Sequence, residues 1–197
     1  FDRPDPNWQQ ARQEAAARVE RIHGEGMVAI AYLPWAFHSV NTALGLEHFS
    51  LLIYDEPDYI NDMFDWVEEG CRKAIEEVVI PAGVDVVLFD GDCAFKNGLM
   101  IRHDMFRDLV YERTEVTTEL LRDAGIFYTL HSDGKADELL PILIELGFSA
   151  FHAISAFCNA GFDLTENSLT AYRYSVLAHG MILPLIVLGG IGFPVLD

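Results

Sequence analysis

Two pairs of polar residues, each following a run of apolar residues, offer the clearest chemistry in this 197-residue chain. Asp90 and Asp92 come after VDVVLF, and His131 and Asp133 come after IFYTL. Residues two apart on an extended strand point to the same side, so His131 and Asp133 can face one ligand. A histidine with carboxylates can bind a divalent metal ion or carry out general acid–base chemistry.

A structural role is the alternative for the same residues. Asp90 and Asp133 could instead cap the following loops by accepting hydrogen bonds from backbone N–H groups. Cys93 could be a thiolate ligand, but a buried inert cysteine is the favoured interpretation. The remaining histidines of this part of the chain carry no pattern and are expected on the surface or in loops: His23, His38, His48 and His103.

Strands that alternate with helices must position these side chains. Apolar runs of strand length occupy 27–33, 84–89 and 126–130, and a further strand is expected at 149–154. Apolar spacings of three and four residues, and the glycines that follow them, predict helices at 7–24, 57–79, 106–124 and 137–146. This alternation predicts right-handed βαβ units and a parallel sheet.

The charge is distributed unevenly along the chain. The net charge of −18 comes from 13 basic and 31 acidic residues. Residues 148–197 hold only Arg173, Asp163, Glu166 and Asp197, a net −2, which leaves −16 for 1–147. A strongly acidic segment does not favour nucleic acid or an anionic membrane surface as a partner, so neither is expected for 1–147.

Cysteine usage and the chain start bear on the location of 1–147. Cys71, Cys93 and Cys158 form no CxxC pair, so neither a disulfide framework nor a thiolate zinc knuckle is indicated. A reducing cytoplasm is therefore the expected location of 1–147. The chain begins at Phe1 with no basic segment or cleavage site, so we expect an internal piece of a longer protein, without a signal peptide.

Val176–Leu196 has a different character. These 21 residues contain no Asp, Glu, Lys or Arg. A helix needs about 20 apolar residues to span a bilayer, and Pro and Gly are tolerated there more than in soluble helices. The segment predicts an inner- or plasma-membrane location for 148–197, with 176–196 in the membrane. A buried core helix is the alternative.

Residues 27–147 resemble the uroporphyrinogen decarboxylase superfamily. Five motifs appear in the family's order: Tyr32-Leu-Pro-Trp35, Glu56-Pro-Asp58, Val84-Asp-Val-Val-Leu-Phe-Asp90, Leu130-His-Ser-Asp-Gly134 and Leu143-Ile-Glu-Leu-Gly147. The resemblance implies an α/β fold, a partial (β/α)8 TIM barrel with about half its strands. It also implies tetrapyrrole decarboxylation, or methyl transfer linked to a corrinoid protein.

The enzyme interpretation assigns roles to individual residues. Catalysis would fall to His131, Asp133 and Asp90, and His131 with Asp133 would bind a metal. Asp92 and Trp35 would contact the cofactor, a divalent metal ion or a corrinoid. The partners would be a small tetrapyrrole or methyl-donor substrate and a corrinoid protein.

The chain departs from this family's pattern where the family carries out its chemistry. Val40 stands nearest the position of the decarboxylases' catalytic tyrosine, and Gly91 stands where they have a serine. Their arginine-rich N-terminal segment and its catalytic aspartate are absent. The thiol methyltransferases use a His-x-Cys zinc pair where this chain has His131-Ser132-Asp133, and a carboxylate makes a harder site than a thiolate.

Residues 148–197 resemble the Trk/Ktr potassium transporter family nearly residue for residue. The resemblance rests on FHAISAFCNAGFDL at 151–164 and LGGIGFPV at 188–195. It implies a pore helix, a selectivity filter for K⁺ and a membrane helix, with four such units lining a pore. The filter stretch would be Asn159, Ala160, Gly161 and Phe162, whose carbonyls replace the ion's hydration shell. A small-residue helix at 153–160 capped by Gly161 is the alternative.

Three interpretations of the whole chain follow. It is a decarboxylase-like enzyme fragment with an incidental tail, a potassium transporter fragment with a foreign N-terminus, or a membrane-tethered enzyme. No linker separates 1–147 from 148–197, which favours a join between two unrelated coding sequences. The enzyme interpretation covers about three-quarters of the residues and is assigned to the chain, with the transporter fragment as the alternative.

Overall fold

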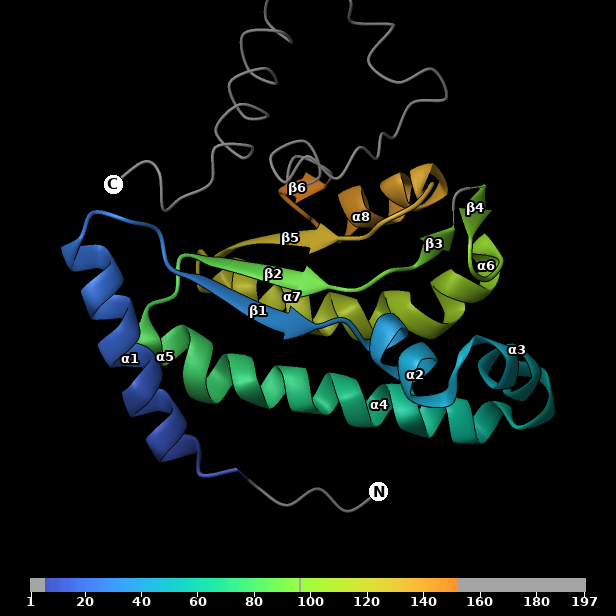
Figure 1. Cartoon of the computed structure of the whole chain (residues 1–197), viewed down its shortest axis with the longest axis horizontal. Helices are drawn as coiled ribbons and strands as arrows, with labels where there is room; N and C mark the ends of the chain where they lie inside the picture. Colours follow the sequence, from blue (N-terminus) through green and yellow to red (C-terminus); the bar gives the residue numbers. More distant parts are fainter. Residues whose placement is uncertain (1–5, 96, 152–197) are drawn as a thin grey trace, which may run out of the picture.

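A parallel sheet flanked by long helices forms the centre of the protein (Figure 1). The computed structural model describes residues 6–95 and 97–151. The strand order in the sheet is β1-β2-β5-β6, and all three pairings are parallel. The strands are β1 (Ile30–Pro34), β2 (Val86–Asp90), β5 (Phe127–His131) and β6 (Ala150–Phe151), and a short antiparallel hairpin joins β3 (Ala94–Phe95) to β4 (Gly98–Leu99).

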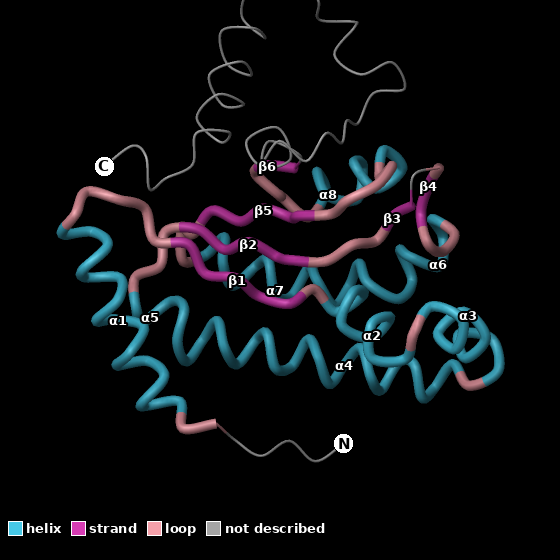
Figure 2. Tube along the Cα trace, viewed as in Figure 1, coloured by secondary structure: helices cyan, strands magenta, loops and turns pink. Residues whose placement is uncertain are grey.

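Helices make up most of the described chain (Figure 2). The two longest helical stretches each contain a π-helical turn. The helices are α1 (Trp8–Gly24), α2 (Ala36–Leu44), α3 (Leu46–Asp55), α4 (Pro57–Ala74) with η1 (Ile75–Val79) and α5 (Ile80–Ala82), α6 (His103–Phe106) with η2 (Arg107–Tyr111) and α7 (Glu112–Asp123), and η3 (Asp137–Leu139) with α8 (Leu140–Glu145).

Local signals explain the elements that the sequence predicted. The side chain of Asn7 accepts a hydrogen bond from the backbone N–H of Gln10 and so caps α1. Pro57 occupies the first turn of α4, where its missing N–H costs nothing. Gly83 ends the α4–η1–α5 stretch with φ 75°. The strands expected at 27–33, 84–89 and 126–130 are present as β1, β2 and β5.

The core lies between the sheet and α4 and α7, which pack side by side (Figure 1). Val87, Phe89 and Leu130 lie on the buried face of the sheet and are at most 2% exposed. An aromatic cluster extends this core beyond the carboxyl ends of the strands. Its members are Trp35, Phe37, Phe49, Phe64 and Phe106, all at most 1% exposed.

The prediction of a partial (β/α)8 barrel is wrong. The described chain is mostly helical, and its small sheet is open, with β1 and β6 at its two ends. On the face opposite the core, Ile30, Tyr32 and Phe127 are 53%, 70% and 64% exposed. Alternating strands and helices specify which strands pair, whereas closure needs a consistent tilt and stagger over every strand. The sequence pattern contains no information on that closure.

The predicted pore loop and membrane helix lie outside the described residues, apart from Phe151 at the end of β6. Within residues 6–95 and 97–151, every helix is too short or too polar to cross a bilayer.

Candidate metal-binding cluster at the sheet edge

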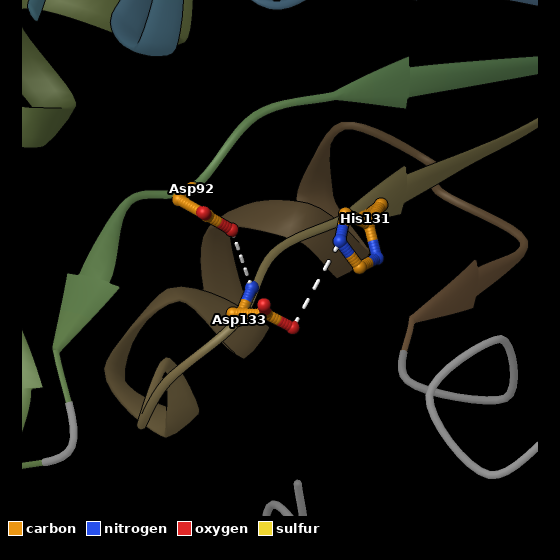
Figure 3. Close-up of side chains that lie close together, drawn as sticks. All are labelled: Asp92, His131 and Asp133. Atoms are coloured by element: carbon orange, nitrogen blue, oxygen red, sulfur yellow. Dashed lines mark hydrogen bonds and ion pairs between the residues drawn. The ribbon is translucent and has the colours of Figure 1, made fainter. Parts of the chain in front are cut away.

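The loops after β2 and β5 bring three possible metal ligands together (Figure 3). Asp92, His131 and Asp133 each offer one ligand atom, and these atoms lie within 4.8 Å of one another. His131 Nε2 is 3.8 Å from Asp133 Oδ1, and both side chains are partly exposed. The sequence spacing predicted that His131 and Asp133 would face one ligand, and the structure places them together.

Backbone hydrogen bonds fix the two loops against each other. The N–H of Asp133 donates to Asp92 Oδ1 over 2.7 Å. The N–H of Gly91 donates to the carbonyl of His131, which continues the β2–β5 pairing past the last residue of β2. Asp92 therefore caps the loop that carries Asp133, a role that the sequence had suggested for Asp90 and Asp133 instead. A carboxylate has two oxygens and about four lone-pair sites, so this bond leaves it able to bind a cation.

His38 supports Asp92 from α2 and was missed by sequence reasoning. The N–H of Asp92 donates to His38 Nδ1 over 3.1 Å, across 54 positions of the chain. That separation leaves no local signal in the sequence. The bond assigns the unprotonated nitrogen to Nδ1 and places the ring against the loop that carries Asp92.

Ser132 and Cys93 lie on the core side of the same loops. Ser132 Oγ accepts a hydrogen bond from the N–H of Cys93 and contacts Cys93 Sγ, both at 3.1 Å. Burial raises the pKa of the Cys93 thiol to about 12, because a thiolate is poorly solvated there. Cys93 is therefore an inert buried thiol at neutral pH, as the favoured interpretation of the sequence predicted.

Two glycines let the loops approach their neighbours. A Cβ on Gly91 would lie 2.7 Å from the Cβ of His38. Gly134 has φ 88°, and a Cβ there would lie 2.5 Å from the carbonyl oxygen of Ala94. A larger residue at position 91 would push the loop of Asp92 away from α2, and one at position 134 would push the loop of Asp133 away from β3, so both loops depend on glycine for their geometry.

Two other predicted site residues lie apart from the cluster. Asp90 is the exposed last residue of β2, and its carboxylate is not among the grouped ligand atoms. Its carbonyl accepts a hydrogen bond from the N–H of Trp35. Trp35 is 1% exposed inside the aromatic cluster, where its Nε1 donates to Thr114 Oγ1. The structure thus places Trp35 in the core, with its indole N–H satisfied by a protein partner.

A cavity of about 490 Å³ lies beyond the β3–β4 hairpin. Its lining combines thioether and polar side chains: Ser50, Tyr54, Met100, Arg102, Met105 and Glu138. The N–H of Met100 donates to the carbonyl of Cys93, one residue from Asp92. The cavity is therefore connected to the cluster through the backbone of one short hairpin.

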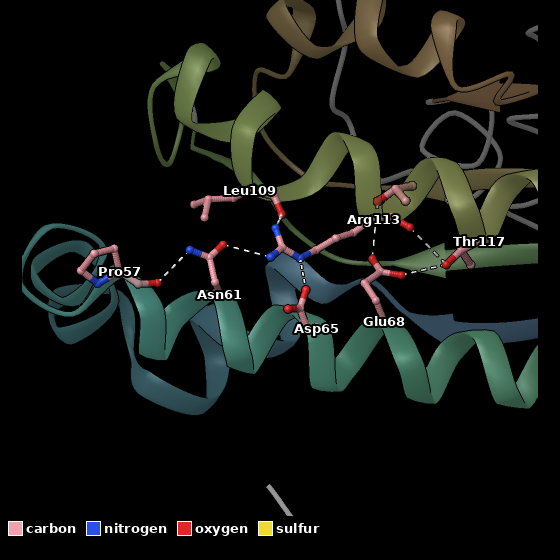
Figure 4. Close-up of polar contacts among 8 residues, drawn as sticks. Pro57, Asn61, Asp65, Glu68, Leu109, Arg113 and Thr117 are labelled. Atoms are coloured by element: carbon pink, nitrogen blue, oxygen red, sulfur yellow. Dashed lines mark hydrogen bonds and ion pairs between the residues drawn. The ribbon is translucent and has the colours of Figure 1, made fainter.

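A buried carboxylate lies between α4 and α7 (Figure 4). Glu68 is 9% exposed and accepts hydrogen bonds from Thr117 Oγ1 at 2.9 Å and Thr114 Oγ1 at 3.5 Å. Burial raises the pKa of Glu68, while the threonine hydroxyls and Arg113 oppose the rise. Thr114 also accepts from Trp35 Nε1, so one chain of bonds joins the aromatic core to Glu68.

Comparison with known proteins supports a transporter segment at the end of the chain. Residues 126–197 match the TrkH family model, described as a cation transport protein. The potassium/sodium uptake protein NtpJ of Enterococcus hirae is 52% identical over 46 residues, which are 23% of this chain and 10% of that protein. Ktr system potassium uptake protein B of Bacillus subtilis is 50% identical over 48 residues, 24% of this chain and 11% of that protein.

These matches are partial. The chain spans about a tenth of the length of the curated relatives it matches. Ktr system potassium uptake protein D of Bacillus subtilis is 46% identical over 46 residues, again 10% of that protein. No solved structure matches the chain.

The comparisons bear differently on the two predicted resemblances. They support the Trk/Ktr resemblance and find nothing in support of the decarboxylase resemblance of 27–147. The family match begins at Ile126, so it includes β5 and α8 and leaves the boundary at 147/148 a prediction. A cation transport family implies membrane association, which agrees with the location predicted for 148–197, whereas the cytoplasmic location of 1–147 has no such support.

Proposed function

We propose that residues 148–197 form one pore-lining unit of a potassium uptake transporter of the Trk/Ktr type. The observation that carries this proposal is the 52% identity over 46 residues to a potassium/sodium uptake protein. Identity at that level supports a common backbone in the matched segment. K⁺ is then the transported ion, and the membrane is the partner of 176–196.

The proposed filter is the stretch from Asn159 to Phe162. Its backbone carbonyls would replace the water around a dehydrated K⁺ ion, and Ala160 and Gly161 leave room for the ion. Gly161 has a physical reason to be glycine, because a filter backbone needs dihedral angles that other residues resist. A helix C-cap would explain Gly161 alone, but not the surrounding identity.

The proposed membrane helix is Val176–Leu196. Its 21 residues match the hydrocarbon thickness of a bilayer, and its glycines at 189, 190 and 192 allow close packing against another helix. A single unit cannot enclose a pore. Transport therefore needs further units, in agreement with the small share of the relatives that this chain covers.

A segment exchange tests this proposal directly. Residues 148–197 would replace the matching segment of the Enterococcus hirae protein, and K⁺ uptake would be measured in cells that depend on that transporter. We expect uptake to persist with the exchanged segment and to be abolished by Gly161→Ala. Gly180→Ala is the matched control, since Gly180 belongs to the proposed membrane helix and not to the proposed filter.

Two results would contradict the filter assignment. One is loss of uptake in the exchanged protein despite normal membrane insertion. The other is equal uptake in the Gly161→Ala and Gly180→Ala variants, which would show that Gly161 has no special backbone requirement.

A further inference from the structure

We propose that Asp92, His131 and Asp133 bind a first-row divalent transition-metal ion, with Mn²⁺ or Zn²⁺ the best fit. This site is independent of the proposed potassium filter, because its ligands belong to the loops after β2 and β5. Two of the three ligands fall in the range matched by the cation transport family, and Asp92 falls outside it. The match therefore cannot account for the complete ligand set.

The distances suit one shared ion. Imidazole nitrogens and carboxylate oxygens bind such ions at about 2.0–2.2 Å, so two ligand atoms on one ion are at most about 4.4 Å apart. The three ligand atoms lie within 4.8 Å of one another, and His131 Nε2 and Asp133 Oδ1 are already 3.8 Å apart. Movements of a few tenths of an ångström would complete the coordination.

The ligands are held in place before an ion arrives. Ser132 lies between two of them and is 4% exposed, anchored to Cys93 on the core side. Its alternation with His131 and Asp133 directs those two side chains away from the core. Asp92 is fixed by the N–H of Asp133 and by His38. Prior ordering of this kind lowers the entropy cost of binding.

The ligand types select the metal. Carboxylate oxygens favour Mg²⁺, Ca²⁺ and Mn²⁺, whereas imidazole favours Zn²⁺, Fe²⁺, Ni²⁺ and Cu²⁺. A set with one imidazole and two carboxylates therefore favours Mn²⁺ or Zn²⁺ over Mg²⁺, which prefers all-oxygen ligands. The buried Cys93 thiol contacts Ser132 Oγ and is not among the grouped ligand atoms, so it adds no soft ligand. Three protein ligands leave coordination positions open, as in catalytic metal sites.

Conservative substitutions separate metal binding from loop capping. Asp92→Asn keeps the oxygen that accepts the Asp133 N–H bond but removes the charge that binds a cation. Asp133→Asn does the same at the second carboxylate, and His131→Gln removes the imidazole. Asp90→Asn is the matched control, because Asp90 is an exposed carboxylate two residues from Asp92 and outside the cluster.

The experiment is titration of the purified full chain, in detergent, with Mn²⁺ followed by electron paramagnetic resonance and with Zn²⁺ and Mg²⁺ by calorimetry. We expect one Mn²⁺ or Zn²⁺ per chain, weaker Mg²⁺ binding, and a loss of affinity of at least about tenfold in each of the three ligand variants. Substitution of outer groups alone commonly costs about 10–100-fold. Asp90→Asn should remain within about twofold of the natural chain, since it removes no ligand.

Circular dichroism without metal checks that each variant is folded. The proposal is overturned if the natural chain binds neither Mn²⁺ nor Zn²⁺ at millimolar concentration. It is also overturned if the folded Asp92→Asn variant binds as tightly as the natural chain, since Asp92 would then serve only as a loop cap. Equal losses in Asp90→Asn and Asp92→Asn would indicate binding to diffuse negative charge rather than to this cluster.

Discussion

The sheet region, residues 6–95 and 97–151, and the apolar segment at 176–196 differ in how their apolar and charged residues are distributed. In the sheet region, strands place buried side chains such as Val87 and Phe89 on one face, and carboxylates surround the core. The segment 176–196 has no Asp, Glu, Lys or Arg on any side. The first pattern suits a region surrounded by water, and the second suits a helix surrounded by lipid or by protein. On the proposed function, one polypeptide therefore has a region that faces water and a segment that faces lipid.

The two regions also differ in how strongly sequence constrains structure. On the proposed function, a filter backbone requires particular residues at successive positions, in agreement with the 52% identity over 46 residues to a potassium/sodium uptake protein. A parallel sheet accepts many apolar sequences on the same backbone. The family match begins at Ile126, whereas most residues of the buried core precede it.

The largest expected effect is on membrane insertion. An arginine at the centre of a membrane helix costs about 2.5–3.5 kcal/mol, so Leu183→Arg combined with Ile186→Arg should move the full chain out of the membrane fraction. The measurement is the share of chain retained after an alkaline carbonate wash. Ile144→Arg is the control, because Ile144 is 74% exposed in the sheet region and tolerates a charge. Retention of the double variant equal to that of the control would count against a lipid-facing helix.

A substitution in the core should lower the stability of the sheet region and leave membrane retention unchanged. Phe106 is 0% exposed and lies 5.3 Å from the rings of both Trp35 and Phe37. Phe106→Ala should lower the free energy of unfolding of the sheet region by about 3–5 kcal/mol, measured by urea denaturation of the full chain. Phe127→Ala, at a position 64% exposed, should change it by less than about 0.5 kcal/mol.

Membrane retention of the Phe106→Ala variant tests whether the sheet region and the segment 176–196 fold independently. If the two regions fold independently, retention stays at the level of the natural chain while the sheet region is destabilised. Joint loss of both properties would show that they form one cooperative unit.

The smallest expected effect concerns the buried Glu68. Glu68→Ala removes the acceptor of the Thr114 hydroxyl and leaves Thr117 Oγ1 only the Arg113 carbonyl at 3.5 Å, so it should cost about 1–3 kcal/mol, whereas Glu68→Gln keeps an acceptor and should cost less. Burial raises the folded pKa of Glu68 above its ordinary value of 4.5. The carboxyl group therefore favours folding below pH 4.5 and loses that contribution as pH rises through the raised pKa.

A pH series of urea denaturation curves measures this dependence. As pH rises above 4.5, the natural chain should lose stability relative to Glu68→Gln. Parallel profiles for the two proteins would show that Glu68 titrates normally, and that the α4–α7 interface is more hydrated than the structure indicates.

Local features of the fold could be predicted from the sequence, and distant ones could not. The cap at Asn7, Pro57 in the first turn of α4 and the apolar strand runs all act within a few residues. Helices α2 and α3 were not predicted, because neither Trp35 nor Gly45 provides a side-chain cap before them. The barrel was predicted wrongly because closure depends on all the strands together.

The candidate metal-binding cluster likewise combines local features that the sequence predicted with distant ones that it did not. The spacing of His131 and Asp133 along one strand end was sufficient to expect them together. The inclusion of Asp92 and the exclusion of Asp90 depend on how the loop after β2 turns at Gly91. His38 joins the site across 54 positions, so only the folded chain shows its part.

Membrane fractionation of the expressed full chain, with an alkaline carbonate wash, tests the central claim that this polypeptide combines a water-exposed sheet region with a membrane segment. We predict that the chain remains in the washed membranes. A soluble, monodisperse chain in the supernatant would contradict the claim, and would mean that Val176–Leu196 is buried against the rest of the protein instead of in lipid.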